Sequence, residues 1–269
     1  MLNELEKARF LRQRLDRGEA CLGTQAALLD PAVMEIFGAA GFDFVAIDTE
    51  HAAHSPVTVR AMLQACAGTA AVAIVRILRL NAAEIGRLLD LGAGGVLCPF
   101  VNTADEAREL VAACRYPPRG TRSWGPRRAA GYGVENGDYE TLASEAVICL
   151  AMIETEEAVT NIEEIAAVEG LTGVVVGPID LSISLGARQD YDSERYVEAV
   201  TRVREACRAA SLPMGVGAAG LEQAEQFVHP GDQLLLVGGD DLAVASAARA
   251  IVAGMRPGEH VAERPWSAQ

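Results

Sequence analysis

Apolar and polar positions follow one another along this chain in a regular rhythm of short and long segments. A charged, amphipathic segment at about residues 3–17 is predicted to form a helix, and short apolar runs then alternate with longer runs of helical period. The short runs lie at residues 20–27, 44–48, 72–77, 95–99, 147–153, 173–176, 214–217 and 233–237. Each is almost continuously apolar, as is typical of strands buried on both faces of a parallel sheet.

Capping signals indicate where the intervening helices begin and end. Helix starts are indicated by Asp30-Pro31, Ser55-Pro56, Asn81 and the capping box Thr103–Glu106, and helix ends by Gly41, Gly68, Gly92 and Gly170. Eight strand–helix pairs predict an α/β protein, a (β/α)8 TIM barrel with an N-terminal helix. An open, doubly wound sheet is the competing architecture, but it usually has fewer strands, and no G-x-G-x-x-G follows the first predicted strand.

Two segments interrupt the rhythm. We expect a single domain over residues 1–255, followed by a polar tail at 256–269. Residues 115–138 form a long polar stretch rich in Pro, Gly and Arg. A variable surface loop and a lid or subunit contact are equally compatible with its composition. Its Arg122, Trp124, Arg127 and Arg128 are candidates for recognising the second substrate of a two-substrate reaction.

Composition narrows the class of protein. The chain has 269 residues, of which 50% are hydrophobic and 22% charged, enough for one sizeable core. Its formal net charge of −14 argues against nucleic acid or an anionic membrane as partner. There is neither an apolar run of about 18–20 residues nor an apolar signal-peptide centre near the start, so we expect a cytoplasmic protein. The six cysteines are widely spaced and are expected to be buried thiols.

Chemistry in a TIM barrel is carried by residues at the carboxyl ends of the strands. Glu154 and Asp180 each follow an apolar strand, and neighbouring strands would direct both toward the same mouth. Two such carboxylates repel unless a cation neutralises them, and oxygen ligands suit Mg²⁺ or Mn²⁺. A solvated pair of acids, one of them capping a helix, is the alternative that spacing alone leaves open.

A histidine and an arginine lie at the same level. His51 follows Asp48 and Glu50 and could serve as a general base, although an isolated histidine is as often a surface or cap residue. Arg76 lies in an apolar run and needs a partner; it either faces the mouth or extends outward between helices. Asp90, by itself, cannot be distinguished from an ordinary acid at a helix end.

Four motifs resemble those of the HpcH/HpaI aldolase family, the metal-dependent class II pyruvate aldolases. They are FDFVAIDTEH at 42–51, RYPPRGTRS at 115–123, IETEEA at 153–158 and GPIDLS at 177–182. Their joint order, over about residues 18–255, is far more specific than any one motif. The resemblance implies a TIM barrel, usually hexameric with swapped C-terminal helices, that reversibly cleaves 4-hydroxy-2-oxo acids to pyruvate and an aldehyde. Such reactions belong to aromatic or sugar acid catabolism.

The same resemblance implies a role for each matched residue. Catalysis falls to His51 as the base, Asp90 as the acid that raises its basicity and Arg76 as the group that stabilises the enolate. Metal binding falls to Glu154 and Asp180, with Asp48 and Glu50 as supporting acids, and substrate binding to Gly177, Pro178, Ile179, Asp180 and Met152. The implied cofactor is Mg²⁺ or Mn²⁺, with Co²⁺ also acceptable, and no nucleotide.

Two positions depart from the family's pattern. Many members have Gln at the position of Met152 and Ala at the position of Ile179. One hydrogen bond to the substrate is therefore missing, and the pocket is expected to be tighter and more apolar, so the substrate could differ.

The lysine content excludes one mechanism. Lys7 is the only lysine, and it precedes the first strand, so a Schiff-base aldolase is not expected. Rival functions are a CoA-thioester lyase or phosphoenolpyruvate-type enzyme on the same barrel, and a non-catalytic ligand-binding barrel. The glycine-rich turns at 215–220 and 237–241 could hold phosphate, but Asp240 and Asp241 beside them disfavour an anion.

Overall fold

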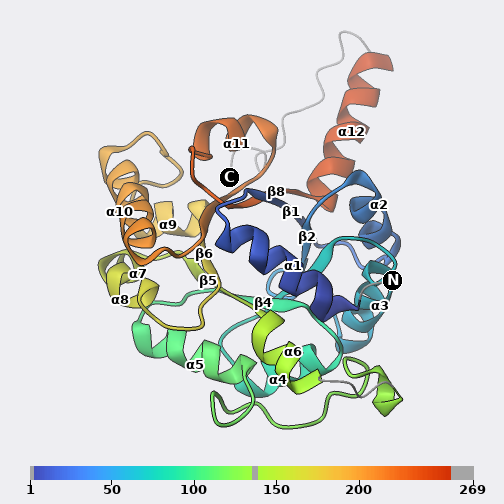
Figure 1. Cartoon of the computed structure of the whole chain (residues 1–269). Coiled ribbons are helices and arrows are strands. Elements are labelled where there is room, and N and C mark those ends of the chain that lie inside the picture. The colour runs from blue at the N-terminus through green and yellow to red at the C-terminus, as the bar shows by residue number, and fades with distance from the viewer. Residues whose placement is uncertain (1–2, 135–138, 256–269) are drawn as a thin grey trace.

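Eight parallel strands close into a barrel in which each strand pairs with the next one along the chain (Figure 1). The computed structural model describes residues 3–134 and 139–255. The strands are β1 (Cys21–Ala26), β2 (Phe44–Asp48), β3 (Val72–Arg76), β4 (Gly95–Cys98), β5 (Ile148–Ile153), β6 (Gly173–Val176), β7 (Met214–Ala218) and β8 (Leu234–Gly239). Closure comes from β1, which pairs with both β2 and β8. The predicted TIM barrel is confirmed, with strand ends displaced by no more than a few residues.

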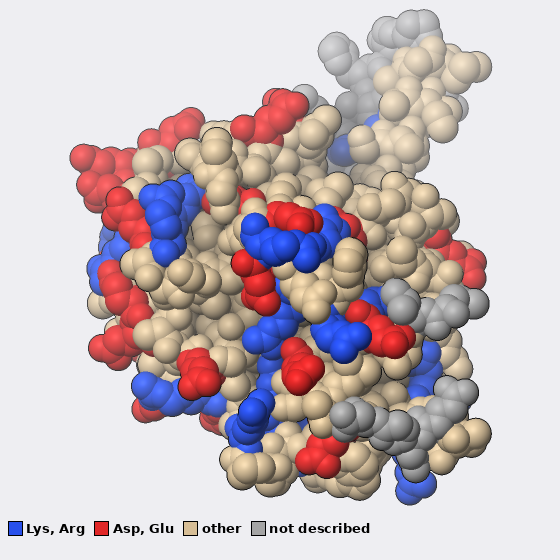
Figure 2. Space-filling view, viewed as in Figure 1, with Lys and Arg blue, Asp and Glu red and all other residues tan. Residues whose placement is uncertain are grey.

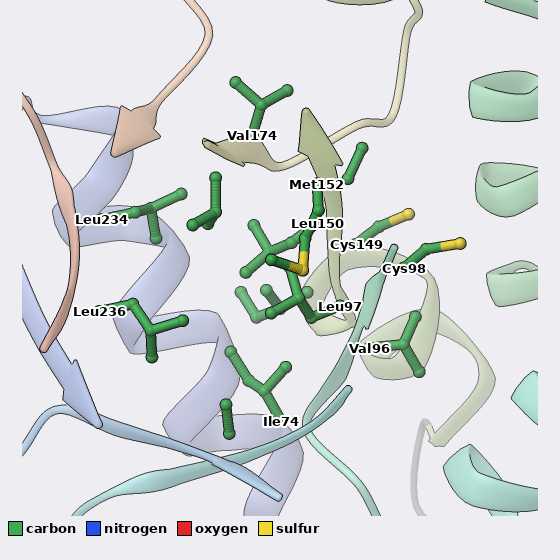
Figure 3. Packing of buried hydrophobic residues seen from close by; sticks show 14 of the residues in the cluster. Ile74, Val96, Leu97, Cys98, Cys149, Leu150, Met152, Val174, Leu234 and Leu236 are labelled. Carbon is green, nitrogen blue, oxygen red and sulfur yellow. The ribbon is translucent and has the colours of Figure 1, made fainter. Parts of the chain in front are cut away.

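The interior of the barrel is filled by side chains that alternate along the strands. Ile74, Leu97, Leu150 and Leu236 come from four different strands and point toward one another (Figure 3). Because side chains alternate with a period of two, the residues at the carboxyl ends of these strands continue the same inward-facing rows. The barrel is thus a packed scaffold, and its last inward positions are available for chemistry.

Twelve α-helices are present in the described residues, more than the one per strand that the sequence predicted. They are α1 (Glu4–Asp16), α2 (Ala32–Ala40), α3 (Pro56–Cys66), α4 (Ala82–Asp90), α5 (Ala104–Cys114), α6 (Tyr139–Ala146), α7 (Glu156–Thr160), α8 (Ile162–Ala166), α9 (Pro178–Ser184), α10 (Glu194–Ala210), α11 (Leu221–Phe227) and α12 (Asp240–Met255). The side chains of Ser55, Asn81 and Thr103 accept the expected N-cap hydrogen bonds. At α2, Asp30 accepts the amide of Ala32, although the N-cap position falls on Pro31.

Helix α1 closes the end of the barrel at which the strands begin (Figure 1). Lys7 Nζ donates to the carbonyls of Cys66, Thr69 and Ala71, just before β3, and pairs with Glu4 at 2.7 Å. Glu4 also accepts the amide of Ala73. The only lysine is therefore buried at the opposite end from the carboxyl ends of the strands, where no substrate carbonyl bound at those ends could reach it.

The segment after α5 packs against the barrel rather than extending into solvent. Over residues 115–134 it contains one short 3-10 helix, Gly131–Gly133, and the buried Arg122. Residues 135–138, the rest of the predicted loop, lie outside the described residues, as does the predicted polar tail at 256–269. Of the two alternatives for this segment, a freely varying surface loop fits the buried arginine less well.

Acidic side chains on the surface fit the negative net charge of the chain. Asp and Glu side chains gather over α7, α8 and α10 on the face that carries α1 (Figure 2). All six cysteines are free and buried, as predicted. In the described parts of the chain, no helix is both long and apolar enough to span a bilayer.

The contacts of Lys7 predict a large contribution to stability. In a Lys7→Met variant, three carbonyls each lose a charged donor and Glu4 loses its cationic partner, so we expect the free energy of unfolding to fall by about 3–5 kcal/mol. Urea unfolding monitored by circular dichroism measures the change. Arg9→Met, at an exposed position of the same helix, is the matched control. A loss below about 1 kcal/mol for Lys7→Met would contradict this account.

Candidate active site

An ion pair between the last residues of β2 and β3 forms one side of the site. The register of the two strands places Asp48 beside Arg76. Arg76 Nε donates to Asp48 Oδ1 at 3.0 Å and Nη2 donates to Oδ2 at 2.7 Å. Such a bidentate pair fixes the plane of the guanidinium as well as its position. Arg76 therefore faces the mouth, which resolves the choice that the sequence left open.

Asp48 also organises the turn that carries His51. Its Oδ1 accepts the amides of Glu50 at 3.0 Å and His51 at 3.2 Å. Burial acts to raise the pKa of Asp48, but the hydrogen bonds and charge of Arg76, together with these amides, outweigh it and hold the pKa below its ordinary value. Asp48 is consequently a charged, buried anchor for both functional residues.

Glu50 lies between Arg76 and His51. Its Oε2 is 3.5 Å from Arg76 Nε and 3.8 Å from His51 Nε2, and the oxygen is buried without a hydrogen-bond partner. Burial raises the pKa of Glu50, and the charges of Asp48 and Asp180 add to the effect, although Arg76 and His51 oppose it. The His51 side chain, in contrast, is 64% exposed and accessible to a substrate.

Glu154 follows β5 and is held in place by two neighbours. The backbone amide of Phe100 donates to Glu154 Oε2 at 3.0 Å. Gly177 lies so close that a Cβ there would come within 2.5 Å of Glu154 Oε1, so only glycine is compatible with this carboxylate position. The Glu154 side chain is almost fully buried. Burial, with the charges of Glu50 and Asp180, raises the pKa of Glu154 to about 7.

Asp180 belongs to the first turn of α9, directly after β6. Gly177 is the N-cap residue and Pro178 the first helical residue, so the amides of Ile179 and Asp180 lie at the start of the helix, where intrahelical acceptors are missing. Ile179 is exposed and Asp180 half-buried. Since β5 and β6 are adjacent, Glu154 and Asp180 lie on neighbouring strand ends, as the sequence predicted.

The donor set fits a divalent cation. Three carboxylates, Glu50, Glu154 and Asp180, influence one another's charge, while Arg76 is engaged by Asp48. A bound cation would remove this repulsion, and Glu154 Oε1 would be one of its ligands. No cluster of three ligating side chains is formed within residues 3–134 and 139–255, so Glu154 and Asp180 would supply two ligands and water or substrate the others.

Met152 lies one inward position below Glu154 on β5, and its side chain is buried within the barrel (Figure 3). It presents a thioether, a weak acceptor at best, to the floor of the site. The floor of the site is therefore apolar at this position.

Asp90 lies apart from His51 of the same chain, so its implied role toward that histidine stays a prediction. It is the last residue of α4, four residues before Gly94, which lies against Glu4 of α1 at the opposite end of the barrel. There Asp90 Oδ1 accepts a hydrogen bond from Arg122 Nη2 at 2.7 Å. The helix between β3 and β4 runs antiparallel to the strands, so its last residue cannot lie at the strands' carboxyl ends.

Sequence reasoning missed the role of Phe100. Its backbone, at φ 52°, has the left-handed conformation that is uncommon for a non-glycine residue, and its amide holds Glu154. No side-chain signal could have indicated this contact, because a backbone amide makes it.

Comparison with known proteins identifies the family. The family model of the HpcH/HpaI aldolase/citrate lyase family matches residues 24–247. A 4-hydroxy-2-oxo-heptane-1,7-dioate aldolase of Salmonella paratyphi A is 35% identical over 243 residues, 90% of this chain and 92% of the relative. A hydroxypyruvate/pyruvate aldolase of Rhizorhabdus wittichii is 40% identical over 224 residues, 80% of this chain and 86% of the relative.

A solved structure of a member of the same family has the same fold. A HpcH/HpaI aldolase/citrate lyase family protein from Burkholderia cenocepacia superposes with a TM-score of 0.87 at 30% sequence identity, covering 92% of this chain and 99% of the other. The chain belongs to the HpcH/HpaI aldolase/citrate lyase family. The predicted family and the predicted class of enzyme, an aldolase, are confirmed.

The raised pKa of Glu154 predicts a pH dependence of stability. The folded protein binds this proton more tightly than the unfolded chain, whose Glu has the ordinary value of 4.5. Stability of the metal-free protein therefore falls as pH rises from about 4.5 to about 7 and changes little from this source above that range. Glu154→Gln removes the contribution, so at pH 8 the variant should be more stable than the parent by on the order of 2 kcal/mol, with little difference at pH 5.

Urea unfolding in EDTA between pH 5 and 8 measures this difference. Glu164→Gln, at an exposed position of α8, is the matched control and should not change the profile. Parallel profiles for Glu154→Gln and the parent protein would show that Glu154 does not titrate in this window.

Proposed function

We propose that this protein is a divalent-metal-dependent aldolase that reversibly cleaves a 4-hydroxy-2-oxo acid to pyruvate, or a close 2-oxo acid, and an aldehyde. The proposal is carried by one observation: a buried Glu154 and a neighbouring Asp180 lie at adjacent strand ends beside Arg76, which is fixed by two hydrogen bonds to Asp48. The relatives' names support it, since two of them denote aldolases of 2-oxo acids.

Glu154 and Asp180 would hold the metal ion, Mg²⁺ or Mn²⁺, with Co²⁺ as a further candidate. When bound, the ion supplies positive charge that stabilises an enolate oxygen. The amides of Ile179 and Asp180, at the start of α9, are placed to donate to the carboxylate of a 2-oxo acid. The exposed Ile179 and the buried Met152 give this half of the pocket an apolar lining.

Arg76 and His51 would carry the charge and proton chemistry. Arg76 Nη1 makes no hydrogen bond within the described residues, so this nitrogen is left to donate to the developing enolate. His51 is exposed, and Asp48 fixes its backbone, so it is the residue placed to take the proton from the 4-hydroxyl group in cleavage and pass it to the enolate carbon, which gives pyruvate. In synthesis the order is reversed: His51 takes a methyl proton of pyruvate and returns it to the new hydroxyl group.

Exchange of the methyl protons of pyruvate tests the first half of this chemistry without knowledge of the aldehyde. In D₂O with Mn²⁺ or Mg²⁺, the protein should remove the pyruvate methyl signal from the proton NMR spectrum, and EDTA should stop the exchange. Arg76→Ala should slow exchange about 10²-fold, because one preorganised donor to an oxyanion is typically worth that much. His51→Ala should abolish it.

Two variants control for loss of a histidine or an arginine elsewhere. His229→Ala, beyond α11, and Arg79→Ala, exposed and three residues after Arg76, should exchange at the parent rate. Exchange that persists in EDTA would refute metal dependence, and a loss below threefold in Arg76→Ala would refute its role. No exchange with any metal would indicate a different substrate class.

We further infer that the enzyme is a homo-oligomer in which α12 packs against another copy. Figure 1 shows α12 extending away from the barrel. Of its sixteen residues only Asp240 is buried, and the exposed ones include Val244, Ile251, Val252 and Met255. A continuous exposed apolar helix is unfavourable in water and typical of an interface. The hexamer implied by the family resemblance is one arrangement that would cover it.

In an oligomer, Asp90 could act on a His51 side chain, which it cannot reach within a single chain. Asp90 lies far from His51 of its own chain, so it could act on a histidine only if that histidine came from a neighbouring copy. The active site would then be composite, with His51 from one copy and Asp90 from another.

Complementation between two inactive variants tests this arrangement. His51→Ala and Asp90→Ala should each be inactive alone, whereas co-expression should restore activity, because mixed oligomers contain sites with both residues intact. Co-expression of either variant with the double variant is the control and should restore none. Multi-angle light scattering of the parent protein checks the assembly. A monomeric mass, or no recovery from mixed oligomers, would overturn the composite site.

A further inference from the structure

A cavity of about 550 Å³ lies on the outside of the barrel, away from the carboxylates at the strand ends. Its walls come from α3, α4, the end of α5 and the segment 115–134. Five arginines line it, namely Arg60, Arg87, Arg122, Arg127 and Arg128, together with a single acid, Asp90. The volume is in the range of sites for small molecules, roughly 300–1,000 Å³.

Two of these arginines are built into the wall. Arg128 donates to the carbonyls of Leu91 at 2.8 Å and Leu63 at 3.3 Å, and a Cβ at Gly92 would come within 2.4 Å of its Nη1. The Arg122 side chain is fully buried beside Asp90, and its Nε and Nη1 have no hydrogen-bond partner. Both guanidinium groups are thus held rigidly, and Asp90 compensates only one charge.

The other three arginines lie exposed at the rim. Arg60, Arg87 and Arg127 form no ion pair with any residue that the structure describes. Elsewhere, arginines such as Arg14, Arg202 and Arg204 are paired with acids. In a chain with a net charge of −14, a cavity with four uncompensated positive charges is a strong local exception.

We propose that this cavity binds a small anionic ligand bearing a carboxylate or phosphate group. Guanidinium groups bind both anions by charge-assisted, frequently bidentate hydrogen bonds, and the positive potential would concentrate an anion there against the overall charge of the protein. The hydroxyl groups of Thr121 and Ser123 in the same wall are further donors.

Such an anion could come from two sources. One is the acidic end of an aldehyde that reacts in a neighbouring copy; this source rests on the proposed aldolase function and on the composite site, since the cavity contains Asp90. The other is a separate anion, such as inorganic phosphate, that binds without reacting. The chemistry of recognition is the same for both.

Direct binding tests the cavity independently of catalysis. Isothermal titration of the full-length protein with inorganic phosphate and with succinate should show saturable binding of at least one of them. The double variant Arg87→Gln/Arg127→Gln should weaken that binding at least tenfold. The double variant Arg9→Gln/Arg208→Gln, which removes the same number of charges at exposed positions of α1 and α10, should leave it unchanged.

The source of the anion follows from kinetics on the same variants. If KM for the acidic aldehyde succinic semialdehyde rises in the double variant while KM for propanal does not, the cavity receives the acceptor substrate. If both KM values are unchanged while binding of phosphate or succinate is lost, the cavity holds a separate anion. Either result supports the anion site.

Two results would overturn the proposal: no saturable binding of either anion by the parent protein, or equal binding by the parent and the double variant. If the parent binds neither anion and the double variant loses oligomeric mass, the arginines belong to an interface between copies. Because titration needs no turnover, a protein that binds the anions but catalyses no aldol reaction would refute the proposed function and leave this inference intact.

Discussion

The Asp48 carboxylate is the constraint on which the active site depends. It is almost fully buried and accepts four hydrogen bonds, two from the guanidinium of Arg76 and two from the amides of Glu50 and His51. These partners come from the neighbouring strand and from the turn after its own strand. One charged group therefore joins β2, β3 and the His51 turn, and it stays ionised although burial acts to raise its pKa. Neutral Asn could not satisfy the same donors with equal strength.

Glu50 and Glu154, the other buried acids of the site, have raised pKa values, whereas that of Asp48 is lowered. Arg76 neutralises Asp48, so Glu50 and Glu154 remain as buried carboxylates with raised pKa values and mutual repulsion. Rigid backbone holds Glu154 in place, through the amide of Phe100 and the absence of a side chain at Gly177, whereas Glu50 Oε2 is buried without a hydrogen-bond partner. A protein that keeps unfavourable charges at fixed positions is preorganised for a cation that makes them favourable. This balance distinguishes the proposed metal site from a solvated pair of loop acids.

The sequence predicted the strands and the strand-end residues well, and for a physical reason. Both depend on local signals: continuous apolar runs, caps, and a period of two that continues into Asp48, Arg76 and Glu154. Three features could not be predicted. The first is the extra helices: α7 with α8 and α9 with α10 each stand where one helix was expected, and α6 is an additional helix before β5. The second is the Phe100 amide, which carries no side-chain signal, and the third is the raised pKa of Glu154, which depends on burial in the folded protein. Asp90 lies at the opposite end of the barrel from His51 of its own chain, so the role that the family resemblance implies for it stays a prediction.

The position of Asp90 bears on how the two halves of the proposed reaction are recognised. The half that handles the 2-oxo acid is built from strand ends, whose positions follow from the barrel register and allow little variation. The segment 115–134, Asp90 and α12 lie instead at the periphery, where they fill no part of the barrel interior. If copies assemble through such surfaces, recognition of the aldehyde depends on residues that the barrel does not constrain. A single scaffold could then keep its enolate chemistry while its acceptor changes, and the arginines around Asp90 are where this chain differs in charge from the rest of its own surface.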